Sequence, residues 1–422
     1  MASGIQYPEL ALGASYGFAS FGTNAGHNGT SGGAIYQQPD VLEDFVWRAV
    51  YTGANVGKSI SKQFYGKDCG KSYYIGCSSG GRQGFKAVQQ NPELFDGVVA
   101  GAPAVNILAH LAWFATARES LGFSANSSLL SIEQWAAVQK EALNQCDVLD
   151  GASDGILEDP TACKFDWKPL VCTANSNSSS VCLTMAQVEG AAKVFAPVTF
   201  NGTFLHSGHL HGYETDLITF LYLPFVTDWI NEAFRYLVYE DLSWDFASFT
   251  TEDAFNAVVL NPGNISSFEG DISTFRNRGG KILHWHGTAD QLLSMGMSDL
   301  YYNNVRMTLN ASVAELDDFY RYFRASGVGH CSGGPGANYM GQTGGTAASD
   351  HPNDNMLMRM VAWVENGEAP EFVRGTKFVN DTTALGIEFT RKHCKYPRVN
   401  MYKGTGNGTD EEGWECVEPS TL

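Results

Sequence analysis

The sequence predicts an α/β protein in which helices cover a parallel sheet. Strand-like and helix-like stretches alternate before residue 104 and resume after residue 280, which is the pattern that such sheets produce. The 422 residues exceed the usual size of a single core, so a main domain with a second lobe is expected. Hydrophobic residues make up 44% of the chain and charged residues 17%, which is ordinary for a globular protein.

The charge and the hydropathy of the chain exclude two classes of partner. A net charge of -18 disfavours binding to nucleic acid and to anionic membrane surfaces. No apolar run reaches the ~18 residues that a membrane-spanning helix requires, and the most apolar segment, 217–226, is interrupted by Pro224. We therefore expect neither nucleic acid nor a membrane as a partner.

The expected elements follow one another in a simple order. A stretch with helical spacing at 41–65 has Pro39 and Asp40 in front of it and Gly66 behind it, which are typical start and stop signals of a helix. An apolar run at 97–101 indicates a buried strand. In chain order, the sequence predicts a strand with its turn at 10–21, a helix at 41–65, a strand at 72–75, a helix through 85–91, strands at 97–101 and 281–286, a closing helix at 356–363 and a surface loop at 394–422.

The candidate nucleophile lies in a glycine-rich turn between a predicted strand and a predicted helix. There, Gly76, Ser78 and Gly80 form the pattern G-x-S-x-G, which in a strand, turn, helix context is a nucleophile elbow. A serine on such a strained turn needs neighbours without Cβ atoms, so that the chain can reverse tightly and a substrate carbonyl can approach. The alternative is a glycine-rich surface turn. Further features favour the nucleophile.

An aspartate and a histidine follow this serine in a suitable order. Asp290 comes just past the end of an apolar strand, and His330 lies in a glycine-rich loop. Ser78, Asp290 and His330 have the chain order Ser, Asp, His of an α/β-hydrolase triad. In these roles Ser78 attacks, His330 takes and returns the proton, and Asp290 fixes the imidazole tautomer and stabilises the imidazolium. Asp299 and Asp354 lack the placement at a strand end and are not preferred.

Two cysteines flank the candidate nucleophile and the candidate base. Cys77 precedes Ser78, and Cys331 follows His330. A disulfide between them would tie the two catalytic backbones together and limit their drift, where a misplacement of about 1 Å can cost ~100-fold in rate. The alternative is two independent cysteines.

These motifs together resemble the fungal tannase and feruloyl esterase family. The hallmark of that family is Cys-Ser, then Asp, then His-Cys, and it is matched here by Cys77-Ser78, Asp290 and His330-Cys331. The resemblance runs from about residue 5 to near the C-terminus, and the supporting stretches are 23–28, 76–84 and 95–104. It implies a secreted serine esterase that acts on phenolic acid esters.

The alternation of strands and helices lapses between 105 and 271. This insertion is predicted to be a lid domain, which leaves 1–104 and 272–422 as the catalytic domain.

Crowded carboxylates in the loop of this insertion at 146–157 repel one another unless a cation neutralises them, and hard oxygen ligands suit Ca²⁺. The spacing is not that of an EF-hand, and the alternative is an exposed acidic loop. The resemblance implies a structural calcium ion held by the side chains of Asp147, Asp150 and Asp154 and by the carbonyls of Ala152 and Ile156.

Cysteine usage points to an oxidising compartment outside the cell. Besides Cys77 and Cys331, three pairs of close neighbours are expected to form disulfides, and Cys69 is left over. Eight N-x-S/T sequons fit a glycosylated secreted protein. The expected pairs are Cys146 with Cys163, Cys172 with Cys182, and Cys394 with Cys416.

The N-terminus does not read like that of a secreted protein. Residues 1–8 contain neither the basic region nor the long apolar region of a signal peptide. Compared with the family pattern, the chain begins after the first strands of the sheet and after the glycine-rich segment that supplies one N–H of the oxyanion hole. The backbone N–H of Ser79 remains as the identifiable oxyanion donor. Since losing one such donor typically costs ~10²–10³ in turnover, we expect weakened esterase activity.

The sequence therefore predicts an α/β-hydrolase with a large inserted lid, in which the N-terminal strands of the family fold are missing. The resemblance implies a secreted enzyme that hydrolyses feruloyl or other hydroxycinnamoyl esters of plant cell-wall polysaccharides, as in xylan degradation, through an acyl-Ser78 intermediate. Tannase activity on galloyl esters is the second candidate, because both activities use the same triad and the lid decides which acyl group is accepted. An alternative from another class is an inactive, calcium-stabilised secreted binding protein. The oligomeric state stays open.

Overall fold

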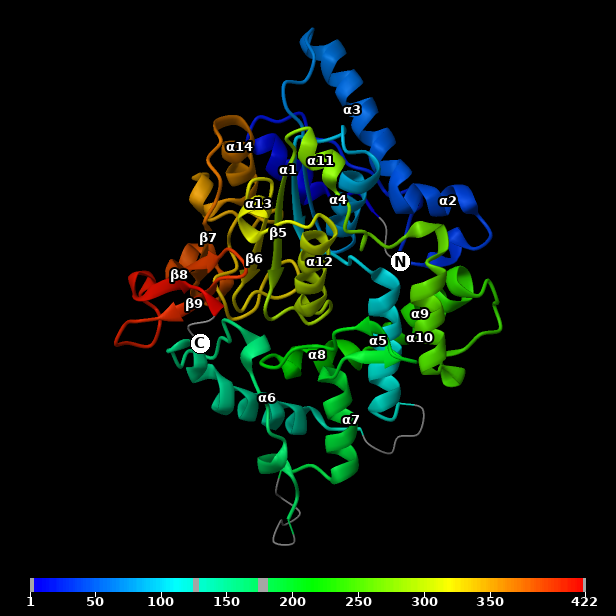
Figure 1. Ribbon diagram of the computed structural model, residues 1–422, viewed down its shortest axis with the longest axis vertical. Helices are drawn as coiled ribbons and strands as arrows, with labels where there is room; N and C mark the ends of the chain where they lie inside the picture. Colours follow the sequence, from blue (N-terminus) through cyan, green and yellow to red (C-terminus); the bar gives the residue numbers. More distant parts are fainter. Residues whose placement is uncertain (1–3, 124–128, 174–180, 420–422) are drawn as a thin grey trace.

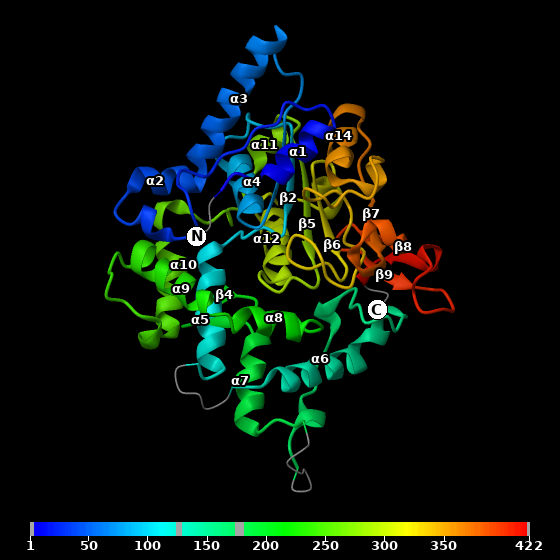
Figure 2. The ribbon, with the colours of Figure 1, turned by 180° about the vertical axis from the view of Figure 1, so that it is seen from behind.

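The computed structural model of the protein describes residues 4–123, 129–173 and 181–419. Within this part of the chain, a four-stranded parallel sheet with the strand order β1-β2-β5-β6 forms the centre, seen from opposite sides in Figures 1 and 2. The predicted α/β class is confirmed. The strands are β1 (Tyr73–Cys77), β2 (Gly97–Gly101), β5 (Lys281–Gly287) and β6 (Tyr320–Ala325).

Helices cover both faces of this sheet, because successive side chains of a strand point to opposite faces. On β5, Ile282 belongs to the core of one face, whereas Leu283 and Trp285 belong to the core of the other. The helices of the first face are α3 (Ala49–Tyr65), α4 (Ser79–Gln90), α11 (Ser273–Asn277) and α12 (Met295–Thr308), and the second face is covered by α14 (Met356–Asn366).

The N-terminal segment is a helix, so the strand predicted at 10–21 is wrong. Helix α1 (Tyr7–Ser15) has a proline in its first turn, where the missing N–H has no intrahelical partner to lose. The leucine and alanine residues that follow have high helix propensity. The helix predicted at 41–65 is confirmed in three consecutive pieces: α2 (Pro39–Glu43), a π-helical turn (Asp44–Arg48) and α3.

Between β2 and β5 the chain forms a helical body, which Figure 1 shows at one end of the sheet. Its core includes Trp113 and Trp135, whose side chains are almost fully buried. Two of the glycosylation sequons in this region, at Asn126 and Asn177, lie outside the described residues. The elements are α5 (Ile107–Ser120), α6 (Ile132–Cys146), α7 (Met185–Phe195), β3 (Val198–Phe200), β4 (Thr203–His206), α8 (Glu214–Leu221), α9 (Pro224–Ala233) and α10 (Thr251–Leu260).

The C-terminal tail contains strands, which corrects the surface loop predicted at 394–422. Trp414 is buried, and the Arg391 guanidinium carbon lies 3.8 Å from the centre of its indole ring. Burial of this aromatic side chain explains why the tail is ordered against the body. The remaining elements are α13 (Val313–Asp317), the antiparallel pair β7 (Phe372–Phe378) and β8 (Ile387–Cys394), and the antiparallel pair β9 (Val399–Tyr402) and β10 (Trp414–Val417).

The predicted disulfides are present, and Cys69 is a free, exposed thiol. Across the described residues, no helix has the length and apolar character needed to cross a bilayer. The disulfides join Cys77 to Cys331, Cys146 to Cys163, Cys172 to Cys182 and Cys394 to Cys416.

Candidate active site

Ser78 occupies a strained turn between β1 and α4. Its φ of 65° and ψ of -121° lie in a region that side-chain-bearing residues seldom adopt. The turn is tight because a Cβ on Gly76 would come within 2.9 Å of the backbone of Gly80, and a Cβ on Gly81 would collide with the carbonyl oxygen of Gly101. The Ser78 N–H donates to that same carbonyl at 2.9 Å. This is the geometry of a nucleophile elbow.

The residue after this serine is well placed to bind a developing oxyanion. Helix α4 begins at Ser79, so the Ser79 N–H is one of the first four helical N–H groups, which have no intrahelical acceptor. The helix dipole adds partial positive charge at the same end. The Ser79 N–H therefore suits the role that the sequence predicts for it.

Asp290 and His330 form a hydrogen-bonded pair at the carboxyl end of the sheet. His330 Nδ1 donates to Asp290 Oδ2 at 2.9 Å, and the backbone N–H groups of Leu292 and Leu293 donate to Oδ1 at 2.8 and 2.9 Å. The backbone N–H of His330 donates to the Gln291 side chain at 3.0 Å. Burial raises the pKa of Asp290, but its interactions with His330 and the nearby histidine His286 outweigh burial and lower that pKa well below the usual range.

The Cys77–Cys331 disulfide brings the base loop to the nucleophile turn. It joins residues 254 positions apart, and the two Cα atoms lie 5.9 Å apart. Ser78 and His330 are the immediate chain neighbours of these cysteines. Within the described residues, no hydrogen bond joins the His330 ring to the Ser78 hydroxyl, a bond that in hydrolases is often long until substrate binds.

The competing aspartates serve other partners. Asp299 is bound by Arg324 at 2.7 Å, and Asp354 by Arg374 at 2.6 Å. Each carboxylate is thus neutralised by a guanidinium in an ion pair. Of the three aspartates weighed from the sequence, Asp290 is the one in contact with His330.

Sequence reasoning missed two residues that support the site. Arg82 on α4 is completely buried, and it donates to the carbonyls of Phe45, Val46 and Ile265 at 3.0 to 3.3 Å; burial lowers its pKa to about 10. It therefore anchors the helix that follows the nucleophile. His286 on β5 contacts Asp290 at 3.1 Å, and the only signal was the pair of histidines at alternate positions of a strand leading to an aspartate.

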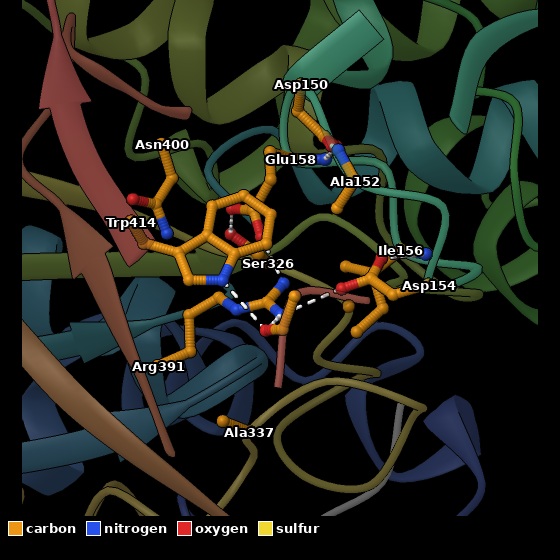
Figure 3. A network of polar contacts seen from close by, with 12 residues as sticks. Asp150, Ala152, Asp154, Ile156, Glu158, Ser326, Ala337, Arg391, Asn400 and Trp414 are labelled. Atoms are coloured by element: carbon orange, nitrogen blue, oxygen red, sulfur yellow. Dashed lines mark hydrogen bonds and ion pairs between the residues drawn. The ribbon is translucent and has the colours of Figure 1, made fainter. Parts of the chain in front are cut away.

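The loop predicted to bind calcium is a network of polar contacts (Figure 3). Burial first, and then the nearby charge of Glu158, raise the pKa of Asp150 to about 8, and burial raises the pKa of Asp147. Arg391 donates to Asp154 Oδ2 at 2.8 Å and to Glu158 Oε1 at 2.6 Å. Throughout the described part of the chain, no three side chains of His, Cys, Asp or Glu are gathered as a metal site.

Comparison with known proteins places this geometry in a family. The family model described as tannase and feruloyl esterase matches residues 3–417. The chain is 47% identical over 418 residues to a probable feruloyl esterase B-1 of Aspergillus flavus, covering 98% of this chain and 78% of that protein.

Two solved structures have the same fold over nearly the whole chain. An esterase from Aspergillus oryzae superposes with a TM-score of 0.94 at 47% identity, covering 98% of this chain and 82% of that one. Feruloyl esterase B from Aspergillus oryzae superposes with a TM-score of 0.93 at 45% identity, covering 98% and 83%. The chain belongs to the tannase and feruloyl esterase family of carboxylic ester hydrolases.

Proposed function

We propose that this protein hydrolyses feruloyl and other hydroxycinnamoyl esters through an acyl-serine intermediate on Ser78. The observation that carries the proposal is the Asp290–His330 hydrogen bond, held beside the Ser78 turn by the Cys77–Cys331 disulfide. The name of the relatives, feruloyl esterase B, supports the choice of acyl group. The four disulfides support a secreted enzyme. The proposed substrates are the feruloyl esters of plant cell-wall polysaccharide.

The proposed reaction uses each group in turn. Neutral His330 accepts the Ser78 proton through Nε2 as the hydroxyl attacks the ester carbonyl, and the Ser79 N–H binds the oxyanion. His330 then gives the proton to the leaving alcohol, and the feruloyl group remains on Ser78. Water, deprotonated by His330, hydrolyses the acyl-enzyme and restores the serine. Asp290 remains ionised throughout and stabilises the imidazolium.

The test of this function compares two substrates. We expect hydrolysis of methyl ferulate with a higher kcat/KM than that of methyl gallate, measured by chromatography of the released acids. The matched family also includes tannases. Faster hydrolysis of methyl gallate would therefore replace the feruloyl esterase proposal with a galloyl esterase. No hydrolysis of either ester would leave the calcium-stabilised binding protein as the better proposal.

We also propose that the 147–156 loop binds a structural Ca²⁺ ion. The ligands would be the carboxylates of Asp147, Asp150 and Asp154 and the carbonyls of Ala152 and Ile156. The support is electrostatic: burial first, and the charge of Asp154 among the further causes, raise the pKa of both Asp147 and Asp150, and a divalent cation would stabilise their ionised forms. Within the described residues these carboxylates are not gathered around one point. The Cys146–Cys163 disulfide clamps the ends of the loop.

Removing calcium should therefore destabilise the protein. At a free calcium concentration of 100 Kd, binding adds about 2.7 kcal/mol to the free energy of unfolding, and a chelator should remove that amount. Urea denaturation with and without EGTA measures it. Asp150→Asn should abolish the calcium response, whereas Asp245→Asn, at an exposed lid carboxylate that binds Arg235, should keep it. An unchanged urea midpoint in EGTA would refute calcium binding.

A further inference from the structure

A chain of buried polar side chains leads from β6 to Asp290 without passing through His330. Tyr320 Oη lies 2.9 Å from His284 Nδ1, and His284 Nε2 lies 2.9 Å from Ser298 Oγ. Ser298 Oγ lies 2.7 Å from His286 Nδ1, and His286 Nε2 lies 3.1 Å from Asp290 Oδ2. All five side chains are almost completely buried. The chain connects β6, β5 and α12 to the catalytic acid.

The direction of every donor in this chain is fixed by its two ends. His286 Nε2 faces the Asp290 carboxylate and the Leu293 carbonyl at 3.0 Å, both of which only accept, so this nitrogen carries the hydrogen. In a neutral imidazole one nitrogen donates and the other accepts, so Nδ1 accepts from the Ser298 hydroxyl. Ser298 in turn accepts from His284 Nε2–H, whose Nδ1 accepts from the Tyr320 hydroxyl. The chain therefore donates in one direction, from Tyr320 to Asp290.

His286 completes the hydrogen bonding of the catalytic carboxylate. Asp290 receives hydrogen bonds from the backbone N–H groups of Leu292 and Leu293 and from His330, and His286 Nε2 lies 3.1 Å from its Oδ2. A carboxylate has about four acceptor sites, and the His286 N–H, which also faces the Leu293 carbonyl at 3.0 Å, lies at the site that the other three donors leave. The carboxylate cannot rotate without breaking one of these contacts, and its orientation toward His330 is held.

We propose that His286 is a positioning residue for the hydrolytic triad, and that Ser298 acts through it by locking the Nε2–H tautomer and the ring orientation. The inference rests on the proposed esterase function. A hydrogen bond that reaches Nδ1 from Ser298 also strengthens the donor at Nε2, because linked hydrogen bonds polarise one another. The contact with His286 thus lowers the basicity of the Asp290 carboxylate, and this basicity sets how strongly Asp290 stabilises protonated His330.

Other titratable groups face this pair without titrating in the working range of an esterase. His110 on α5 and His209 in the loop between β4 and α8 interact with Asp290 and His286. Burial lowers the pKa of His110 to about 3 and that of His209 to about 4, so both are neutral above pH 5. Burial lowers the pKa of His284 and raises that of Tyr320, which keeps both neutral. None of these four groups would therefore change the pH profile between pH 5 and 8 by its own titration.

The decisive comparison is between His286→Leu and His286→Gln. Leucine fills the space without an N–H, whereas glutamine keeps an N–H that can reach the carboxylate. We expect His286→Leu to lower kcat on methyl ferulate about tenfold with little change in KM. Its kcat/KM profile should lose activity at a higher pH on the acid side, by about one pH unit, because a less hydrogen-bonded carboxylate holds protonated His330 more firmly. His286→Gln should restore most of both properties.

Ser298 supplies the second arm of the test. Ser298→Ala should lower kcat about threefold to tenfold in the parent and have no further effect in the His286→Leu background, since it acts through that imidazole. Ser294→Ala is the matched control: this serine is equally buried near the same helix, but it contacts Ser207 instead of the chain. It should leave the pH profile unchanged.

Several results would overturn the proposal. It fails if His286→Leu is as active as His286→Gln, or if Ser298→Ala lowers kcat equally in the parent and in the His286→Leu background. It also fails if the pH profiles of both His286 variants match that of the parent. Nitrogen-15 spectra of the histidine rings decide independently of activity and of variant folding: we expect Nε2–H for His286, and a protonated Nδ1 would refute the donor direction. Hydrolysis that persists in Ser78→Ala would instead refute the esterase site.

Discussion

Replacing Ser78 with alanine should abolish ester hydrolysis, with a loss of about 10⁶-fold in kcat. The hydroxyl is the proposed nucleophile, and without it only binding energy and the oxyanion donor remain. The turn itself should persist, because alanine keeps the Cβ and the backbone N–H that donates to Gly101. Stopped assays on methyl ferulate at high enzyme concentration measure the residual rate.

Two further variants make this experiment specific. His330→Ala should lose about as much as Ser78→Ala, and the double variant should be no worse than either, because the members of a triad act as a unit. Ser72→Ala removes a hydroxyl that binds the Leu94 carbonyl at 3.0 Å and should keep the parent rate. A double variant that loses the product of the two single losses would contradict a shared proton transfer.

Removing both sulfurs of the Cys77–Cys331 disulfide should cost stability and activity together. In the chain-entropy account, a cross-link that closes a loop of 254 residues contributes about 5 kcal/mol to the free energy of unfolding. Replacement of both cysteines with serine should remove most of that amount in urea denaturation. Since the link also holds the His330 backbone beside Ser78, kcat should fall by about 100-fold, the usual cost of a 1 Å misplacement.

The helical body between β2 and β5 offers the matched control for this variant. The disulfide between Cys172 and Cys182 closes a loop of only 10 residues, so its removal should cost about 3 kcal/mol and leave kcat unchanged. If kcat of the Cys77→Ser, Cys331→Ser variant equalled that of the parent while it remained folded, the disulfide would be a stabilising link without a part in alignment.

Some parts of the site could be predicted from the sequence, and others could not. The elbow around Ser78 could be predicted because G-x-S-x-G is local and its glycines are required by the turn. Asp290 could be predicted from its place after an apolar strand, and the disulfides from cysteine spacing and the family motif. The calcium ligands stay a prediction, since they rest on the resemblance and on the charge of a loop.

The missed features depend on contacts between distant parts of the chain. The burial of Arg82 could not be predicted, because it requires three carbonyls that come from residues 45, 46 and 265. The strand predicted at 10–21 failed because its apolar residues fit either period, and the proline at the start favoured a helix. The strands of the tail could not be predicted, because Trp414 lies among glycine-rich, acidic stretches that are typical of a loop. The tail is ordered because Trp414 packs on Arg391.

Arg391 makes the C-terminal strands and the segment between β2 and β5 depend on each other. Its guanidinium, on β8, binds Asp154 and Glu158 of that segment (Figure 3). It also donates to the carbonyl of Gly408 in the tail. Separating Arg391 from either partner would leave a buried charge without its counter-charge, at a cost of about 3–5 kcal/mol. Local opening on one side is therefore penalised by the other, and the two regions should behave as one cooperative unit although more than two hundred residues separate them along the chain.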